Sequence, residues 1–150
     1  MKMKMRRIRP AVLSDAREIA RLNGELGYSA CSGSAQTNLQ SIISSENHAI
    51  IVCEECADQV LGWIVVEKRV SLETGETAEI SGLVVDPGAR RKGIGTALVL
   101  AAEQWAQENE LYKIVVRSNA ARVESHPFYE KLVYVRRKTQ HCYSKQRVSI

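Results

Sequence analysis

The residues with the clearest chemical potential form a basic, glycine-containing turn between an apolar strand and a helix. The turn reads Val84-Val85-Asp86-Pro87-Gly88-Ala89-Arg90-Arg91-Lys92-Gly93-Ile94-Gly95. The first amides of a helix have no partners within the helix and point toward one spot, and glycine lets the backbone approach a ligand's oxygens closely. Arg90, Arg91 and Lys92 add positive charge. The pattern therefore predicts a cradle for an anion such as a pyrophosphate.

Two common phosphate-binding motifs do not fit this turn. A P-loop requires Lys and then Ser or Thr directly after its second glycine, whereas Ile94 and Gly95 follow Gly93. A dinucleotide-binding fingerprint requires Gly or Ala where Leu98 stands and an acidic residue about twenty positions later, where this chain has valines. A simple tight turn between strand and helix would also explain a lone Gly-x-Gly.

Charge and cysteine content narrow the possible ligands. The 150 residues include 21 Lys and Arg against 17 Asp and Glu, and the basic residues gather at 2–9, 90–92 and 136–138. These clusters favour an anionic ligand over nucleic acid, because only 5% of residues are aromatic and none interleave with the basic runs. Cys53 and Cys56 have the spacing of metal ligands, but zinc normally needs a second pair, so no metal is predicted.

The composition is typical of one ordinary globular domain spanning residues 1–150. The chain is 45% hydrophobic and 25% charged, with nine glycines and three prolines. No stretch approaches the roughly 18 apolar residues of a membrane span, and the apolar run after Arg9 is too short for a signal-peptide core. We therefore expect a soluble, cytoplasmic protein with no membrane partner and no disulfide framework.

Hydrophobic spacing predicts the elements that must position the turn. Strands are expected at residues 4–9, 48–53, 60–66, 78–85, 111–116, 133–137 and 141–145. Helices are expected at residues 16–23, 34–45, 93–109 and 123–131. Gly82, inside one of these strands, is typical of a bulge or of a close approach by another part of the chain. The order of elements predicts a mixed α/β sandwich of the α+β type, with about seven strands.

Read in full, the turn resembles a known motif. Arg90-x-x-Gly93-x-Gly95 is similar to the (Gln/Arg)-x-x-Gly-x-(Gly/Ala) acetyl-CoA loop of the GNAT superfamily of N-acetyltransferases. The segment His126-Pro127-Phe128-Tyr129-Glu130-Lys131-Leu132 resembles the closing "FYEKLGF"-type helix of that family. The resemblance covers residues 79–134 well and the remainder in element order only. Val133 departs from it, because such proteins usually have a left-handed Gly there as a helix C-cap, a conformation that Val disfavours.

The resemblance implies a fold and a binding site. The fold would be GNAT-like, with a mixed, mostly antiparallel central sheet and helices on both faces. The strands at 78–85 and 111–116 would splay apart at a bulge near Gly82, with the pantetheine arm of acetyl-CoA in the gap and the pyrophosphate on the turn. The implied acetyl-CoA-binding residues are Leu83, Val84, Val85, Arg90, Arg91, Lys92, Gly93, Ile94, Gly95, Thr96 and Asn119.

The resemblance also implies catalytic roles. The oxyanion that develops during acyl transfer needs backbone N–H donors, for which we expect the Val84 amide. Tyr129 matches the family's general acid, and a phenol with an ordinary pKa of about 10 stays protonated near neutrality. Glu79 is the expected base, acting through water, and His126 or water alone are the alternatives. Without these roles, Tyr129 would be a core tyrosine and Glu79 an exposed strand residue.

The implied function is transfer of the acetyl group of acetyl-CoA to a primary amine by direct attack in a ternary complex. The acceptor is a small-molecule or peptide amine, and the sequence does not choose among aminoglycoside, polyamine, amino acid and protein. One alternative is a non-catalytic acyl-CoA-binding sensor or regulatory module with the same fold. Another is a basic nucleic-acid-binding domain, which would bind with a steep salt dependence. A homodimer through an exposed sheet edge is an expectation by analogy only.

Overall fold

The computed structural model describes residues 6–24, 32–56, 59–89, 93–117 and 125–146. The chain divides into two compact units, Met1–Arg117 and Ser118–Ile150. The first unit contains the sheet and three of the helices, and the second contains one helix and an extended tail. The prediction of a single domain over residues 1–150 stays a prediction.

The first unit is built on a mixed, mostly antiparallel sheet with the strand order β1-β2-β3-β4-β5. The strands are β1 (Arg6–Pro10), β2 (His48–Glu55), β3 (Val60–Ser71), β4 (Gly75–Val85) and β5 (Ile114–Val116). The first four pair antiparallel in chain order, and β5 joins β4 in parallel. A parallel neighbour needs a crossover connection, which α3 (Ile94–Glu108) supplies. The predicted fold class is therefore confirmed.

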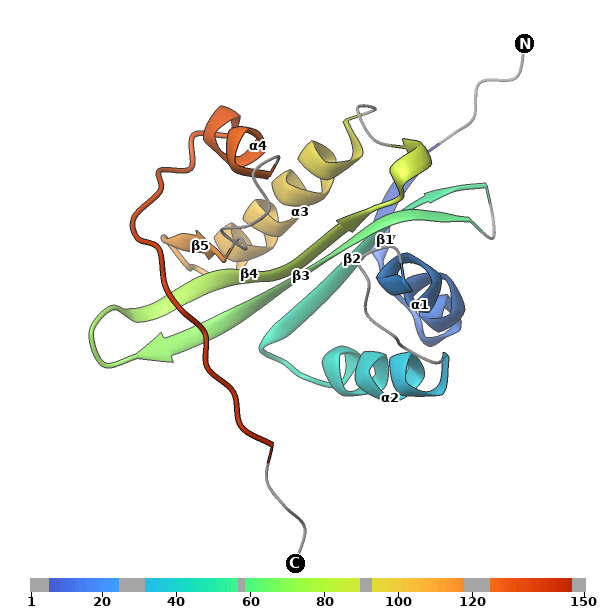
Figure 1. The fold of residues 1–150 in the computed structure, drawn as a ribbon, viewed down its shortest axis with the longest axis horizontal. Helices are drawn as coiled ribbons and strands as arrows, with labels where there is room; N and C mark the ends of the chain where they lie inside the picture. The colour runs from blue at the N-terminus through green and yellow to red at the C-terminus, as the bar shows by residue number, and fades with distance from the viewer. Residues whose placement is uncertain (1–5, 25–31, 57–58, 90–92, 118–124, 147–150) are drawn as a thin grey trace, which may run out of the picture. The chain divides into compact units, whose positions relative to one another are not determined.

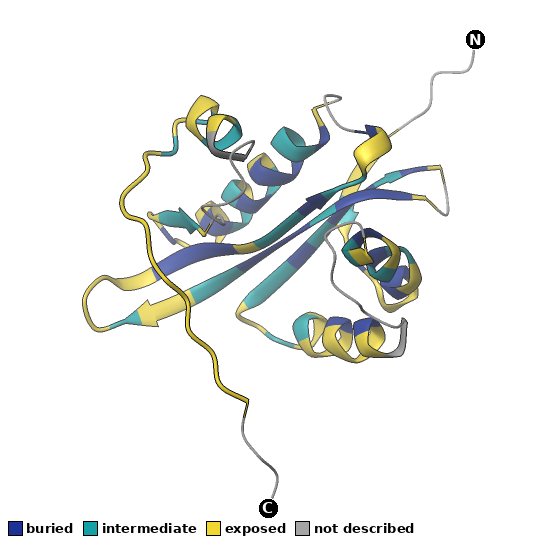
Figure 2. Cartoon of the chain, in the orientation of Figure 1, coloured by how far each residue is buried: buried dark blue, intermediate teal, exposed yellow. Residues whose placement is uncertain are grey.

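Helices cover both faces of this sheet (Figure 1). The helices α1 (Ala16–Gly24) and α2 (Ser32–Ile43) lie on one face, and α3 lies on the other. Two short 3-10 turns, η1 (Leu13–Asp15) and η2 (Pro87–Ala89), precede α1 and α3. The inward side of α3 is fully buried at Leu98, Val99 and Ala102, which recur at helical spacing. Figure 2 shows these buried inner sides against exposed outer ones.

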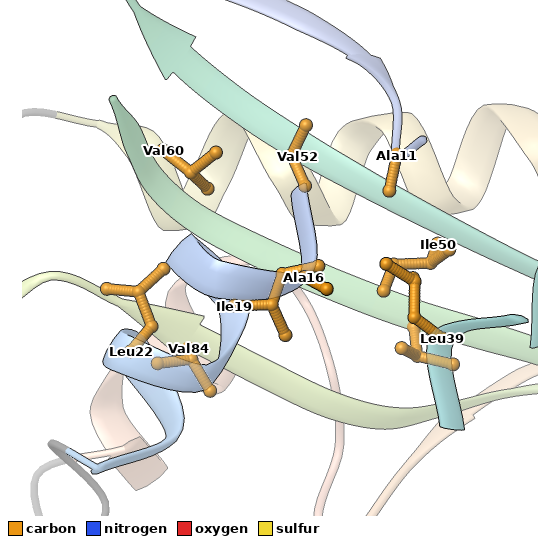
Figure 3. Close-up of a cluster of buried hydrophobic side chains, with 10 residues drawn as sticks. Ala11, Ala16, Ile19, Leu22, Leu39, Ile50, Val52, Val60 and Val84 are labelled. Atoms are coloured by element: carbon orange, nitrogen blue, oxygen red, sulfur yellow. The ribbon is translucent and has the colours of Figure 1, made fainter. Parts of the chain in front are cut away.

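A cluster of buried apolar side chains joins α1 and α2 to the sheet (Figure 3). Half-buried Trp63 of β3 packs against it. The cluster holds α1 against the end of β4 that leads into the glycine-containing turn. Its members are Ala11, Ala16, Ile19, Leu22, Leu39, Ile50, Val52, Val60, Val65 and Val84.

The prediction of about seven strands was wrong: the described residues contain five. The segments at 133–137 and 141–145 form no strand. Their apolar residues, including Val135 and Tyr143, are exposed. A sheet strand is normally held by burying one face as well as by its ladder, and these segments bury no face.

The second unit contains α4 (Ser125–Lys131), which carries Tyr129. The Tyr129 ring packs edge-on against Phe128 and Tyr134, at centroid separations of 5.0 and 6.1 Å. Two residues after the end of the helix, Val133 has a φ of 69°. Val133 thus adopts the left-handed conformation that glycine would supply in the family pattern, and a β-branched residue is strained in that conformation.

Candidate functional site

The strand β4 changes its pairing halfway along its length. Opposite β3, Val66 pairs with Ile80 and Val65 pairs with Gly82, which leaves Ser81 as an extra residue in a bulge. On the other side, β5 pairs with β4 only from Ala78 to Ile80. The ladder between the two strands therefore ends immediately before the bulge. The sequence predicted this bulge at Gly82, one residue from the observed extra residue.

The ladder also fixes which amides of β4 face away from β3. The Asp86 N–H donates to the Leu61 carbonyl oxygen at 2.8 Å. Because hydrogen-bonded pairs alternate with non-bonded pairs in an antiparallel ladder, Val84 directs its N–H and C=O toward β3, whereas Leu83 and Val85 direct theirs away. No strand among the described residues pairs with Leu83 or Val85 on that side. Val84, which we expected to supply the oxyanion donor, is therefore less suitable than Leu83.

Gly82 permits a close approach between β4 and a side chain of β3. A Cβ atom on Gly82 would lie only 2.7 Å from Cζ3 of the Trp63 ring. Gly62 of β3 plays a similar part on the α3 face, where a Cβ would lie 2.8 Å from the Val84 carbonyl oxygen and 3.1 Å from Leu98 Cδ1. The two glycines therefore let both layers pack tightly around the part of β4 that lacks β5.

The start of α3 has the geometry that the sequence predicted for an anion cradle. Gly93 occupies the N-cap position with a φ of 77°, and no side chain caps the helix. A left-handed φ at this position suits glycine. The Ala97 N–H donates to the Gly93 carbonyl oxygen, so the amides of Ile94, Gly95 and Thr96 precede the first intrahelical bond and have no helical acceptor. Arg90, Arg91, Lys92 and Asn119 lie outside the described residues, and their roles stay predictions.

An ion-pair network fixes the turn that follows β4. Arg21 of α1 donates to Asp86 Oδ2 at 2.8 Å and to the Val60 carbonyl oxygen at 3.0 Å. Glu18 accepts from Arg21 Nε at 2.9 Å, and this contact lowers the pKa of Glu18 below its ordinary value. Asp86 Oδ1 accepts the Gly88 N–H at 2.9 Å. An Asp-Pro-Gly sequence suggests such a turn, but nothing local indicates the partner Arg21, 65 residues away.

Glu79 is buried in the middle of the sheet and is not an exposed strand residue. Its Oε1 accepts from Arg117 Nε at 2.7 Å, and its Oε2 accepts from Arg69 Nη1 at 3.1 Å. Neither arginine is recognisable from the sequence as a partner of Glu79, because the contacts depend on strand register. Both carboxylate oxygens are thus engaged by cations, and the predicted role of Glu79 as a base stays a prediction.

Tyr129 lies in the second unit, where its side chain is half-buried between the rings of Phe128 and Tyr134. The carbonyl oxygen of Tyr129 accepts the N–H groups of Leu132 and Tyr134, and these bonds lie at the C-terminal end of α4. Its role as the acid stays a prediction. The side chain of His126 is outside the described part of the structure.

Cys53 and Cys56 differ in how far they are buried. Cys53 is buried, and this burial raises the pKa of its thiol. Cys56 is exposed.

Within the described ranges, no group of three or more His, Cys, Asp or Glu side chains could hold a metal ion. In the same ranges, each helix is too short or too polar to traverse a lipid bilayer.

Comparison with known families shows the family to which this chain belongs. The model of the acetyltransferase (GNAT) family matches residues 14–133. The chain belongs to the GNAT acetyltransferase family. This match confirms the resemblance seen in the sequence. It includes both the part of β4 beyond the bulge, which pairs with β3 only, and α4, which carries Tyr129.

Curated relatives of this GNAT protein are N-acetyltransferases. Glucosamine 6-phosphate N-acetyltransferase 1 of Oryza sativa subsp. japonica is 27% identical over 97 residues, which cover 63% of this chain and 57% of the rice protein. Aminoglycoside N(6')-acetyltransferase type 1 of Klebsiella aerogenes is 28% identical over 106 residues, 67% of this chain and 70% of that protein. The chain thus matches little more than half the length of the rice relative.

Solved structures share the fold. Aminoglycoside N-acetyltransferase AAC(6')-Iy in complex with CoA superposes with a TM-score of 0.86, at 14% identity, covering 97% of this chain and 98% of that chain. A transcriptional regulator from Bacillus halodurans superposes with a TM-score of 0.79 at 23% identity, covering 96% of this chain and 100% of that chain. At these identities the likeness concerns the fold alone.

Proposed function

We propose that this protein is an N-acetyltransferase that transfers the acetyl group of acetyl-CoA to a primary amine in a ternary complex. The observation that carries the proposal is the presence of two open backbone surfaces that are close together in the chain. Leu83 and Val85 face away from β3 where β5 has left the ladder, and the uncapped start of α3 at Gly93 follows one turn later. Membership of the GNAT family and the names of the relatives support it.

These surfaces fit the two parts of acetyl-CoA that a protein backbone can bind. The pantetheine arm contains amide groups, which can pair with an open strand edge as a peptide would. The outward N–H and C=O groups of Leu83 and Val85 would serve this arm. The pyrophosphate would lie on the amides of Ile94, Gly95 and Thr96, because a helix N-terminus stabilises negative charge. The predicted charges of residues 90–92 would add to this attraction.

Acetyl-CoA supplies an acetyl group activated as a thioester. During the reaction the amine nitrogen forms a bond to the acetyl carbon, the carbon–sulfur bond breaks, the amine loses a proton and the sulfur gains one. The outward amide of Leu83 would stabilise the negative charge that develops on the carbonyl oxygen. Tyr129 would donate the proton to the departing sulfur. His126 or water would accept the proton from the amine, because both oxygens of Glu79, the base predicted from the sequence, accept from arginines.

For the acceptor, we propose a small molecule with a primary amine, as the names of the relatives suggest. The test is release of free CoA thiol when the protein is mixed with acetyl-CoA and a panel of amino sugars, aminoglycosides, polyamines, amino acids and amino-terminal peptides. Amine-dependent thiol release supports the enzyme. Tight acetyl-CoA binding without thiol release for any amine would indicate a sensor module instead.

The role of Tyr129 can be tested by Tyr129→Phe. Loss of a general acid should lower kcat by about 100-fold, whereas the Kd for acetyl-CoA measured by calorimetry should stay close to that of the wild type. The matched control is Tyr112→Phe, because Tyr112 is an exposed tyrosine just before β5. An unchanged kcat at saturating acetyl-CoA in the Tyr129 variant would reject the acid role.

A further inference from the structure

A buried carboxylate joins three neighbouring strands at the point where β4 and β5 separate. Glu79 of β4 accepts from Arg69 of β3 at 3.1 Å and from Arg117, the residue after β5, at 2.7 Å. The Glu79 side chain is 7% exposed, and the two arginine side chains are 53% and 58% exposed. We call these three residues the arginine clamp.

The strand register places the clamp beside the opening. Glu79 pairs with Val115, and the last pair of the ladder joins Ile80 to Val116. Arg117 is therefore the first residue beyond the ladder, and its ion pair to Glu79 is a further attachment of this end of β5 to β4. Since β5 is only three residues long, the backbone hydrogen bonds of its ladder alone give limited stability. The Arg117–Glu79 ion pair therefore contributes a large part of what holds β5 against β4.

The contacts of Glu79 suit attachment better than proton transfer. Hydrogen bonds between arginine and a carboxylate are charge-assisted and about twice as strong as neutral ones. A base acting through water needs a carboxylate oxygen that the water can reach, whereas here the side chain is buried and each oxygen already accepts from an arginine. Removal of Arg117 would leave the buried carboxylate paired with Arg69 and without its partner on the β5 side, which is unfavourable.

We infer that Glu79 is a positioning residue, which holds Arg117 and thereby sets how far the end of β5 stands from Leu83 and Val85. This inference rests on the proposed function, because it assigns the opening between the strands to the pantetheine arm of acetyl-CoA. Loosening the arginine clamp should make the separation between β4 and the end of β5 wider or more variable. Acetyl-CoA binding should then weaken without a change in the chemistry of the amine.

The test compares Glu79→Gln, Arg117→Ala, Arg117→Lys and the double variant Glu79→Gln/Arg117→Ala. Lys113→Ala is the matched control, because Lys113 is an exposed cation at the opposite end of β5. Three quantities are measured: amide hydrogen exchange of peptides covering β5 without ligand, the Kd for acetyl-CoA by calorimetry, and the pH profile of kcat. Hydrogen exchange needs neither acetyl-CoA nor an acceptor.

Glu79→Gln and Arg117→Ala should each speed exchange in β5 about tenfold and raise the Kd by a similar factor. The double variant should be no worse than Glu79→Gln alone, since the contact that Arg117→Ala removes is already lost in that variant. Arg117→Lys should restore part of the loss, Lys113→Ala should resemble the wild type, and the shape of the pH profile should be unchanged in every variant.

Two results would overturn the inference. One is unchanged β5 exchange in both Glu79→Gln and Arg117→Ala, which would show that the clamp holds nothing. The other is a loss of the pH-dependent limb of kcat in Glu79→Gln while Arg117→Ala retains wild-type binding and exchange, which would make Glu79 the base. If the wild type fails to bind acetyl-CoA, the proposed function fails, and the exchange data alone then decide whether the clamp positions β5.

Discussion

The two halves of β4 have the same neighbour on one side and different surroundings on the other. From Ala78 to Ile80 the strand is paired with both β3 and β5, and these residues are buried. From Gly82 to Val85 it is paired with β3 only, and Ser81 before it is exposed. One extra residue, Ser81, separates the halves. The same strand thus supplies an interior position for Glu79 and an open edge for a ligand.

An unpaired strand edge is ordinarily a liability, because exposed N–H and C=O groups can pair with another chain. Here the open edge is short, running over a few residues between the bulge and the turn at Asp86. Its amides need water or a ligand as partners. The difference between the halves therefore indicates where binding energy is available without disturbing the core.

The largest expected effect comes from proline in the open half, compared at adjacent positions. Val84→Pro removes an N–H that faces β3 and should lower the free energy of unfolding by about 3 kcal/mol or more. Leu83→Pro removes an N–H that faces the opening, so it should cost less stability and lower kcat by roughly 100-fold to 1,000-fold. Thermal unfolding and acetyl-CoA-dependent turnover measure the two effects.

The control for this pair is Leu83→Ala, which shortens the side chain and keeps the amide. Its turnover should stay near the wild-type value if the Leu83 amide is what matters. Equal loss of stability in both proline variants would show that the two amides do not face opposite sides. Normal turnover in Leu83→Pro would reject the oxyanion role of the Leu83 amide.

A smaller effect is expected from adding one methyl group at either of two glycines of β4, Gly82 at the bulge and Gly75 at the start of the strand. In Gly82→Ala the new Cβ would lie 2.7 Å from the Trp63 ring, and such overpacking should cost about 1–3 kcal/mol. In Gly75→Ala the new Cβ meets nothing within 4 Å, but the φ of 72° is unfavourable for alanine, which should cost about 1 kcal/mol. Denaturant unfolding measures both.

The two causes can be separated by trimming the tryptophan. Trp63→Leu removes the ring atoms that Gly82→Ala would contact, so the double variant should regain part of the lost stability relative to the sum of the single variants. The same change should give no relief to Gly75→Ala. Additive costs at Gly82 and Trp63 would contradict the close approach seen at the bulge.

The smallest effect concerns the network that ties α1 to the end of the open half. Because Arg21 lowers the pKa of Glu18 below its ordinary value of 4.5, the folded state favours the ionised carboxylate. This stabilisation is complete above the unfolded pKa and disappears as the pH falls through the folded one. Glu18→Gln should therefore lower the free energy of unfolding by about 1 kcal/mol at neutral pH, and the difference should vanish in acid.

Denaturant unfolding between neutral and acidic pH measures this difference. The control is Glu46→Gln, which changes an exposed carboxylate between α2 and β2. In this variant the free energy of unfolding should depend on pH almost as it does in the wild type. A gap between Glu18→Gln and wild type that persists unchanged in acid would show that the Arg21 contact does not stabilise the fold.

Local features of this protein were predictable from the sequence. The left-handed Gly93, the start of α3 and the turn at Asp86-Pro87-Gly88 depend on residues adjacent in the chain, whose conformational preferences can be read directly. The family was likewise visible because Arg90, Gly93 and Gly95 form a contiguous motif, and the family model confirms it. Even the departure at Val133 marked a real left-handed residue.

What only the tertiary structure decided depends on pairing between distant segments. The outward direction of Leu83 rather than Val84 follows from strand register, which a one-residue bulge reverses. The burial of Glu79 between Arg69 and Arg117, and the absence of strands at 133–137 and 141–145 from the described sheet, arise in the same way. Hydrophobic alternation shows that a segment can form a strand, but its partner and register are set by packing across the whole sheet.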